Sequence, residues 1–192
     1  TLDSLAASAP EPGDLVCVSG YSLVGRTRDP LVEWLDTLAD GVVVVLDPGA
    51  TFAGLAEPLR DRVLARTDVW TGNADEAAAL TGVRGMREAA EVVATLLAPD
   101  AVTIVRDGAR GCAVRESGGT THCPGHPQRP VDTNGAGDTH TGVLLAERAT
   151  GASWADAAAR ANAAGAIKVT RRGPDTAPTR AEIDAFLANQ PR

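Results

Sequence analysis

The sequence predicts an α/β protein, a three-layer α/β/α sandwich around a mostly parallel sheet. Short apolar segments alternate along the chain with longer segments whose apolar residues recur at helical spacing. One segment, 42–46, is apolar and β-branched almost throughout, which is typical of a parallel strand covered on both faces. The 192 residues suffice for one domain with a sizeable core, and no repeat or linker interrupts the alternation.

The composition argues against several classes of function. A formal net charge of −7 disfavours a surface for nucleic acid or anionic membranes, so an anionic ligand needs a local site. No apolar run approaches the roughly 20 residues of a membrane span, and the first residues lack the features of a signal peptide. The three cysteines are scattered and odd in number, which indicates reduced thiols and predicts a cytoplasmic protein.

We expect a loose segment over 1–14 and then a single domain over 15–192. The expected elements of its first part are strands at 15–20, 42–46 and 68–70 and helices at 30–39 and 55–66. The second strand stops at Asp47-Pro48-Gly49, a turn. Ligands in such sheets bind at the carboxyl ends of strands, so Asp47 is expected at the functional edge.

Asn73 and Glu76 have the spacing of a capping box in front of a short helix at 77–80. Capping is one explanation of this pair and ligand binding is the other. The elements expected next are a helix at 87–97, a strand at 101–105, a glycine-bearing turn at 106–111, a strand at 112–115 and a hairpin-like turn at 118–119. His122, Cys123 and His126 resemble metal ligands, but a structural zinc site needs four, so a loop between strands is favoured.

Three helices are expected in the last third of the chain. The first has apolar residues from Val143 and ends at 150–151, the second begins at Ser153, and the third follows a capping box at 179–182. Trp154 and a stripe of alanines on the second helix indicate close packing. Asn162 lies beside that stripe, where a polar side chain should have a partner.

The most informative stretch runs from Asp132 to Thr139 and brings two glycines and an acid to the start of a helix. Glycines and a helix N-terminus both present backbone N–H groups, so this is a natural seat for an anion such as phosphate. Asp138 at its mouth is either a helix cap or a general base held beside a phosphoryl group. The local pattern leaves both open.

Together these segments resemble the ribokinase-like (PfkB) family of carbohydrate and nucleoside kinases. The motifs that carry the resemblance occur in the family's order and spacing, at 73–76, 105–111, 132–138, 161–173 and 182–187. The resemblance implies a ribokinase-like fold. It also implies that the chain is the C-terminal two-thirds of such a kinase, lacking the N-terminal strands, the lid and most sugar-binding residues.

The implied activity is ATP-dependent phosphorylation of a hydroxyl on a sugar or nucleoside-like small molecule. Asp138 would be the general base, and Gly135, Ala136 and Gly137 would form an anion hole for the transferring phosphoryl group. Asn73 and Glu76 would lie near the triphosphate of ATP and its Mg²⁺, with Glu76 acting through water. The further nucleotide-binding residues that the resemblance implies are Arg106, Gly108, Arg110, Gly111 and, beside the adenine, Asn162.

A monovalent cation, K⁺ in particular, is a further implied cofactor. Its candidate ligands are the carbonyls of Asp132, Asn134, Lys168, Arg171 and Gly173, together with Thr176. Two residues depart from the family pattern. Arg106 stands where many relatives have threonine, which substitutes a charge contact for a hydroxyl contact with phosphate. His140 replaces a common phenylalanine and is either a structural histidine with a partner or a residue that faces the substrate cleft.

A second class of function stays open, a catalytically inactive ATP-binding module or sensor derived from such a kinase. An intact Asp138 counts against it, and the missing N-terminal portion counts for it. Loss of that portion should expose a sheet edge and apolar surface, so we expect either marginal stability or self-association, with a homodimer as the candidate assembly.

Overall fold

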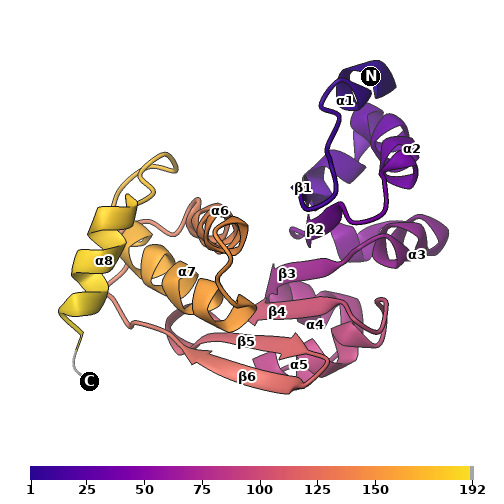
Figure 1. Cartoon of the computed structure of the whole chain (residues 1–192). Coiled ribbons are helices and arrows are strands. Elements are labelled where there is room, and N and C mark those ends of the chain that lie inside the picture. Colours follow the sequence, from indigo (N-terminus) through magenta and orange to yellow (C-terminus); the bar gives the residue numbers. More distant parts are fainter. Residues whose placement is uncertain (191–192) are drawn as a thin grey trace. The chain divides into compact units, whose positions relative to one another are not determined.

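A computed structural model describes residues 1–190 and divides the chain into two compact units. The first unit comprises Thr1–Val105 and Arg115–Thr120, and the second comprises Arg106–Val114 and the chain from Thr121 on. Figure 1 labels the helices and strands of both. Each unit carries its own part of the predicted site, Asn73 and Glu76 in the first unit and Asp132–Asp138 in the second.

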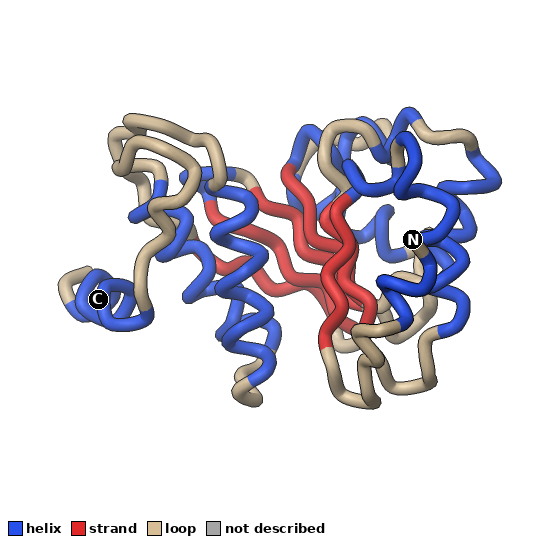
Figure 2. The backbone as a smooth tube through the Cα atoms, turned by 90° about the horizontal axis from the view of Figure 1, so that it is seen from above, coloured by secondary structure: helices blue, strands red, loops and turns tan. Residues whose placement is uncertain are grey.

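Six strands form one sheet and follow one another in chain order. Figure 2 draws the strands in red. They are β1 (Leu15–Ser19), β2 (Val43–Asp47), β3 (Val69–Asn73), β4 (Val102–Arg106), β5 (Gly111–Glu116) and β6 (Gly119–Pro124). The first three run parallel, with Cys17 opposite Val45 and Val45 opposite Val69. The α/β class and the mostly parallel sheet are therefore confirmed.

The first unit surrounds its strands with five helices. These are α1 (Leu2–Ala6), α2 (Arg28–Thr37), α3 (Glu57–Ala65), α4 (Ala74–Thr81) and α5 (Met86–Ala94). The apolar run on β2 is buried at Val44, Val45 and Leu46 and partly buried at Val43, and Trp70 on the neighbouring strand β3 is also buried. The segment over 1–14, expected to be loose, contains α1, which Thr1 caps and which packs against α2.

The second unit is built on three helices, α6 (Ala136–Ala149), α7 (Trp154–Lys168) and α8 (Arg180–Ala188). The alanine stripe on α7 is completely buried, because small side chains let α6 approach closely. Ile183 on α8 packs against Ala163 and Ala164 of α7. The capping box that Thr179 and Glu182 predict at the start of α8 is confirmed.

Two elements, α6 and β6, differ most from the sequence prediction. Helix α6 begins at Ala136, seven residues before the apolar cluster at Val143 that marked it, because its first turns consist of small and polar residues. His122 and Cys123 lie on β6 and not in a loop. Their strand has little apolar alternation to reveal it, and it forms because the turn after β5 returns the chain alongside that strand.

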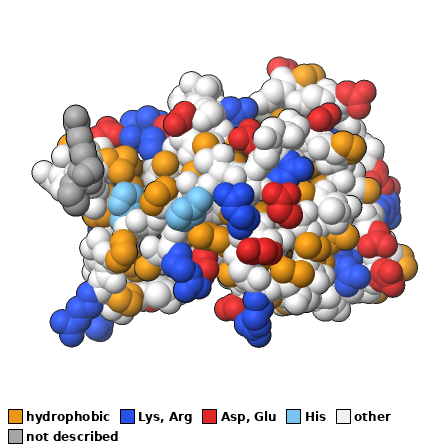
Figure 3. Space-filling view, turned by 90° about the horizontal axis from the view of Figure 1, so that it is seen from below, with side chains coloured by type: hydrophobic (Ala, Val, Ile, Leu, Met, Phe, Trp, Pro, Cys, Tyr) orange, Lys and Arg blue, Asp and Glu red, His pale blue; other side chains and the backbone are white. Residues whose placement is uncertain are grey.

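Among residues 1–190, no helix combines the length and the apolar character that a membrane span requires. The charged side chains on the face drawn in Figure 3 mix both signs. On that face, basic residues are interspersed with acidic ones and do not gather into a patch of the kind that binds nucleic acid.

Candidate active site

The second unit contains the predicted anion seat, at the start of α6. Gly135 is the N-cap residue and adopts a left-handed backbone conformation with φ of 77°. Within the described residues, the backbone N–H groups of Gly135, Gly137 and Asp138 have no hydrogen-bond partner, whereas that of Ala136 donates to the Thr133 carbonyl at 3.2 Å. Three free donors at the positive end of a helix make a seat suited to an anion.

Asp138 is the third residue of α6, and its side chain does not cap the helix. The carboxylate is exposed and makes no hydrogen bond or ion pair with any of the described residues. An acid in the first turn is favoured by the helix dipole, but that effect requires no particular contact. The capping alternative therefore loses its support, and the carboxylate is placed beside the free N–H groups where a base could act.

Arg106, the last residue of β4, contacts the first turns of α6, the helix whose start forms the anion seat. The residue is 8% exposed, and its guanidinium donates from Nη1 to the Gly137 carbonyl at 2.9 Å and to Thr141 Oγ1 at 3.4 Å. The positive charge of the guanidinium thus lies next to the first turn of α6. The charge contact with phosphate that the resemblance implies for Arg106 stays a prediction, and the contacts with Gly137 and Thr141 hold the helix turn that presents the N–H groups.

Asp132 fastens the loop that leads into the seat. Its Oδ1 accepts from the Asn134 backbone N–H at 3.0 Å and its Oδ2 accepts from that of Gly173 at 2.9 Å. These two hydrogen bonds are the main reason why the pKa of Asp132 lies below its ordinary value. The chain after Gly173 also constrains Gly135, because a Cβ there would lie 2.8 Å from the Pro174 carbonyl oxygen.

His140 and Asn162 form a buried pair between α6 and α7. His140 Nε2 lies 3.1 Å from Asn162 Oδ1, and the Asn162 amide donates to the carbonyls of Cys123 and Pro124. Because the amide nitrogen is the donor to those carbonyls, Oδ1 accepts from a neutral His140. Burial, and then the charge of Arg106, lower the pKa of His140 to about 3. His140 is therefore a structural histidine with a partner.

The contacts of Asn162 bear on its predicted place beside the adenine. Its residue is 8% exposed, and its amide is already engaged with three protein groups. A hydrogen bond donated to a base would have to replace one of the two to the carbonyls, whereas Oδ1 has a second lone pair with which it could accept one. Its nucleotide role stays a prediction.

The predicted nucleotide loop joins β4 to β5 through a 3-10 helix at Gly108–Arg110. Arg110 is exposed and makes a two-pronged ion pair with Asp107, with both hydrogen bonds at 2.7 Å. Gly111 could not carry a side chain, because a Cβ would lie 2.1 Å from the Cys123 carbonyl oxygen. Nothing lies within 4 Å of a Cβ built on Gly108, so that side of the loop is open to a ligand.

Asn73 and Glu76 belong to the first unit, where they form the predicted capping box of α4. Asn73 Oδ1 accepts from the Glu76 N–H at 2.9 Å, and Glu76 Oε2 accepts from the Asn73 N–H at 2.7 Å. Both residues also line a pocket of about 290 Å³. The other lining residues are Pro48, Gly49, Ala50, Phe52, Ala53, Asp75, Ala79 and Leu80. The pocket opens where β2 and β3 end, the edge at which ligands bind in such sheets.

The acidic side chains at this pocket fit magnesium better than a tightly coordinated metal. No group of three or more His, Cys, Asp or Glu side chains in residues 1–190 could hold a metal ion. Mg²⁺ retains several waters and is usually bound by one or two carboxylates and by phosphate oxygens. Glu76 and Asp75 supply carboxylates of that kind at the pocket.

The predicted ligands of a monovalent cation lie together in the second unit, but several of them already bind donors of the chain. The Asp132 carbonyl accepts from Lys168 Nζ at 3.5 Å. The Gly173 carbonyl accepts from Thr176 Oγ1 at 2.9 Å, and the Thr176 carbonyl accepts from Arg171 at 3.3 Å. The sequence prediction includes only the carbonyl of Lys168. It does not include the contact of the Lys168 side chain with the Asp132 carbonyl.

Known proteins that are similar in sequence to this chain include carbohydrate kinases. The sequence matches the pfkB family of carbohydrate kinases over residues 2–180. It is 34% identical over 185 residues to an uncharacterised sugar kinase of Escherichia coli (strain K12), YegV, covering 93% of this chain and 56% of that protein.

Two solved structures are similar in fold. The Salmonella enterica aminoimidazole riboside kinase, complexed with aminoimidazole riboside and an ATP analogue, has a TM-score of 0.81 and 26% identity, over 95% of this chain and 66% of that one. A fructokinase double mutant from Vibrio cholerae O395, in a form with fructose, ADP and a potassium ion, has a TM-score of 0.80 and 26% identity, over 93% and 61%.

The chain therefore belongs to the pfkB family of carbohydrate kinases and has a ribokinase-like fold. It spans about half the length of the curated relatives that it matches, 56% of the E. coli sugar kinase and 48% of a Haemophilus influenzae ribokinase.

Proposed function

We propose that the protein containing this chain transfers the γ-phosphoryl group of ATP to a hydroxyl group of a sugar or nucleoside-like small molecule. Asp138 takes the proton from that hydroxyl as its oxygen bonds to phosphorus, and ADP leaves with the electrons of the broken P–O bond. The observation that carries the proposal is the exposed Asp138 carboxylate, which has no partner among residues 1–190 and lies next to three backbone N–H groups that also lack partners there.

The surrounding contacts support this assignment. The free N–H groups would stabilise negative charge on the phosphoryl oxygens, and Arg106 holds the turn that presents them. Asp132 fixes the preceding loop by two hydrogen bonds, so that the donors are in place before the substrate arrives. Relatives that are named ribokinase and sugar kinase support the reaction class.

Magnesium would be held near Glu76, through water, and by the phosphates of the nucleotide. Its chemistry is to neutralise charge on those phosphates. The chain contributes the position of the carboxylate, which the capping box fixes at the pocket that opens where β2 and β3 end.

The test is Asp138→Asn in the full-length protein, assayed over a panel of sugars and nucleosides. Removal of a general base should lower kcat by about 10²–10⁴-fold, while calorimetric titration should show ATP binding largely kept. Near-normal turnover would refute the base assignment.

Asp156→Asn is the matched control. Asp156 is the third residue of α7, so the change removes the same charge from the same helical position in the same unit. Asparagine can keep the contact of Asp156 with the capping residue Ser153. Its turnover should match that of the wild type. ATP binding by the wild type without a phosphorylated product from any acceptor would favour an inactive nucleotide-binding module instead.

A further inference from the structure

Lys168 is the single lysine of the sequence, and every other basic residue is an arginine. It is the last residue of α7, and it has no exposed surface. Lysine is almost never fully buried without a partner, because removing an ammonium group from water is unfavourable. Its Nζ donates to the Asp132 carbonyl, and its charge is one of the influences that lower the pKa of the Asp132 carboxyl.

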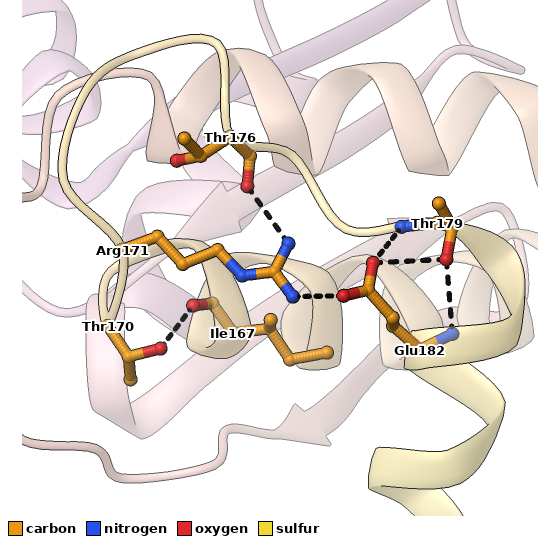
Figure 4. Close-up of polar contacts among 6 residues, drawn as sticks. All are labelled: Ile167, Thr170, Arg171, Thr176, Thr179 and Glu182. Atoms are coloured by element: carbon orange, nitrogen blue, oxygen red, sulfur yellow. Dashed lines mark hydrogen bonds and ion pairs between the residues drawn. The ribbon is translucent and has the colours of Figure 1, made fainter.

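The loop after α7 contains a second cationic contact. Arg171 donates to the Thr176 carbonyl and pairs with the Glu182 carboxylate, so its guanidinium lies between the loop and α8 (Figure 4). Thr176 in turn donates from Oγ1 to the Gly173 carbonyl at 2.9 Å. Two more carbonyls that could have coordinated an ion are thus engaged by donors of the chain.

These contacts do not fit a cage of free carbonyls for a monovalent cation. Two of the predicted carbonyl ligands, those of Asp132 and Gly173, and the carbonyl of Thr176 accept hydrogen bonds from side chains. Two of the donors, Lys168 and Arg171, are cationic. A K⁺ ion beside the Asp132 carbonyl would also meet the buried ammonium, and like charges at that range repel.

An ammonium group can supply the same single positive charge next to the Asp132 carbonyl as a K⁺ ion would. It is a compact point charge with three donors, unlike the planar guanidinium of arginine. Asp132 connects it to the active site, since the Asp132 carboxylate holds the Asn134 N–H in the loop that leads to Gly135. Lys168 would therefore act through Asp132, as a positioning residue.

We propose that the Lys168 ammonium takes the place of a monovalent cation behind the anion seat, so that the seat is organised without K⁺. The predicted effect on turnover rests on the proposed kinase function. The predicted effect on thermal unfolding concerns only Lys168 and the loops that it joins. The structure of the Vibrio cholerae fructokinase contains a potassium ion.

The first test is thermal unfolding of the full-length protein in KCl and in choline chloride, each at about 0.1 M so that charge screening is equal. The Tm of the wild type should be the same in both salts. That of Lys168→Met should fall by at least roughly 2–4 °C in choline chloride, and KCl should restore most of the loss, because K⁺ can then bind beside Asp132.

Arg172→Met is the matched control for lost charge. Arg172 is exposed, and its charge also acts on Asp132, yet its removal opens no buried position for an ion. Its Tm should show no preference for KCl. A rise in the Tm of the wild type specific to KCl would overturn the proposal, as would equal Tm values of Lys168→Met in the two salts. The wild-type comparison decides even if the Lys168 variant does not fold.

The second test is turnover by the full-length kinase in the same two salts. The wild type should be equally active in both, whereas Lys168→Met should lose roughly 10-fold in kcat in choline chloride and recover in KCl. Strong activation of the wild type by K⁺ would contradict the proposal. If the wild type yields no product in either salt, the kinase proposal fails, and the unfolding experiment still decides the role of Lys168.

Discussion

Replacing Gly137 by alanine should change the free energy of unfolding through two effects that act in opposite directions. Gly137 lies in the first turn of α6, and alanine is preferred over glycine inside a helix by about 0.5–1 kcal/mol. However, an added Cβ would lie 3.0 Å from Nη1 of Arg106, the nitrogen that donates to the Gly137 carbonyl. A hydrogen bond from a charged group contributes about 1.5–3 kcal/mol. If the guanidinium is displaced, the net change is a destabilisation of roughly 0.5–2.5 kcal/mol.

Urea unfolding of the chain and its variants measures this difference. Gly142→Ala is the control, because Gly142 lies in the same helix and nothing lies within 4 Å of a Cβ built there. It should stabilise the chain by about 0.5–1 kcal/mol. In an Arg106→Met background the penalty of Gly137→Ala should shrink, since no guanidinium remains to displace. Stabilisation by Gly137→Ala equal to that by Gly142→Ala would refute the reasoning.

Two further predictions concern pH and nucleotide binding. The pKa of His140 is about 3 in the folded chain and 6.5 ordinarily, so its stabilising effect is complete above pH 6.5 and is lost as the pH falls toward 3. His140→Phe should flatten this part of the pH–stability profile, and an unchanged slope would contradict the assignment. Asn73→Ala should cost about 1 kcal/mol of stability and also weaken ATP binding to the full-length protein in calorimetric titration. Thr179→Ala, which breaks the other capping box, should cost similar stability but leave ATP affinity intact, and equal losses of affinity would exclude a nucleotide role for Asn73.

Elements with an apolar pattern were predictable from the sequence. The run that forms β2 has no polar residue until Asp47, and a short, β-branched run of this kind favours a strand covered on both faces. Elements made of small or polar residues were not. The first turns of α6 contain Gly137 and Thr139, which have no helical apolar period, and β6 depends on its pairing with β5. Tertiary context decides such segments.

The anion seat was predictable because its signal is local, two glycines and an acid within four residues at the start of a helix. The groups that support it were not, because their partners are distant in sequence. Arg106 contacts Gly137, 31 residues away, and Lys168 contacts Asp132, 36 residues away. No local pattern indicates whether a basic side chain points to a phosphate, to solvent or to a backbone carbonyl.

The hydrogen bond between Asp132 and Gly173 has a consequence for biosynthesis. It joins residues 41 positions apart, and Gly135 is held against the Pro174 carbonyl. Polypeptides are made from the N-terminus, and their domains fold as units while synthesis proceeds. The first unit can therefore fold while the ribosome is still translating the rest of the second, but the turn at Gly135 lacks these contacts until the codons for residues 173 and 174 have been read. A nascent chain stalled before that point would carry Asp138 without the loop that sets its position.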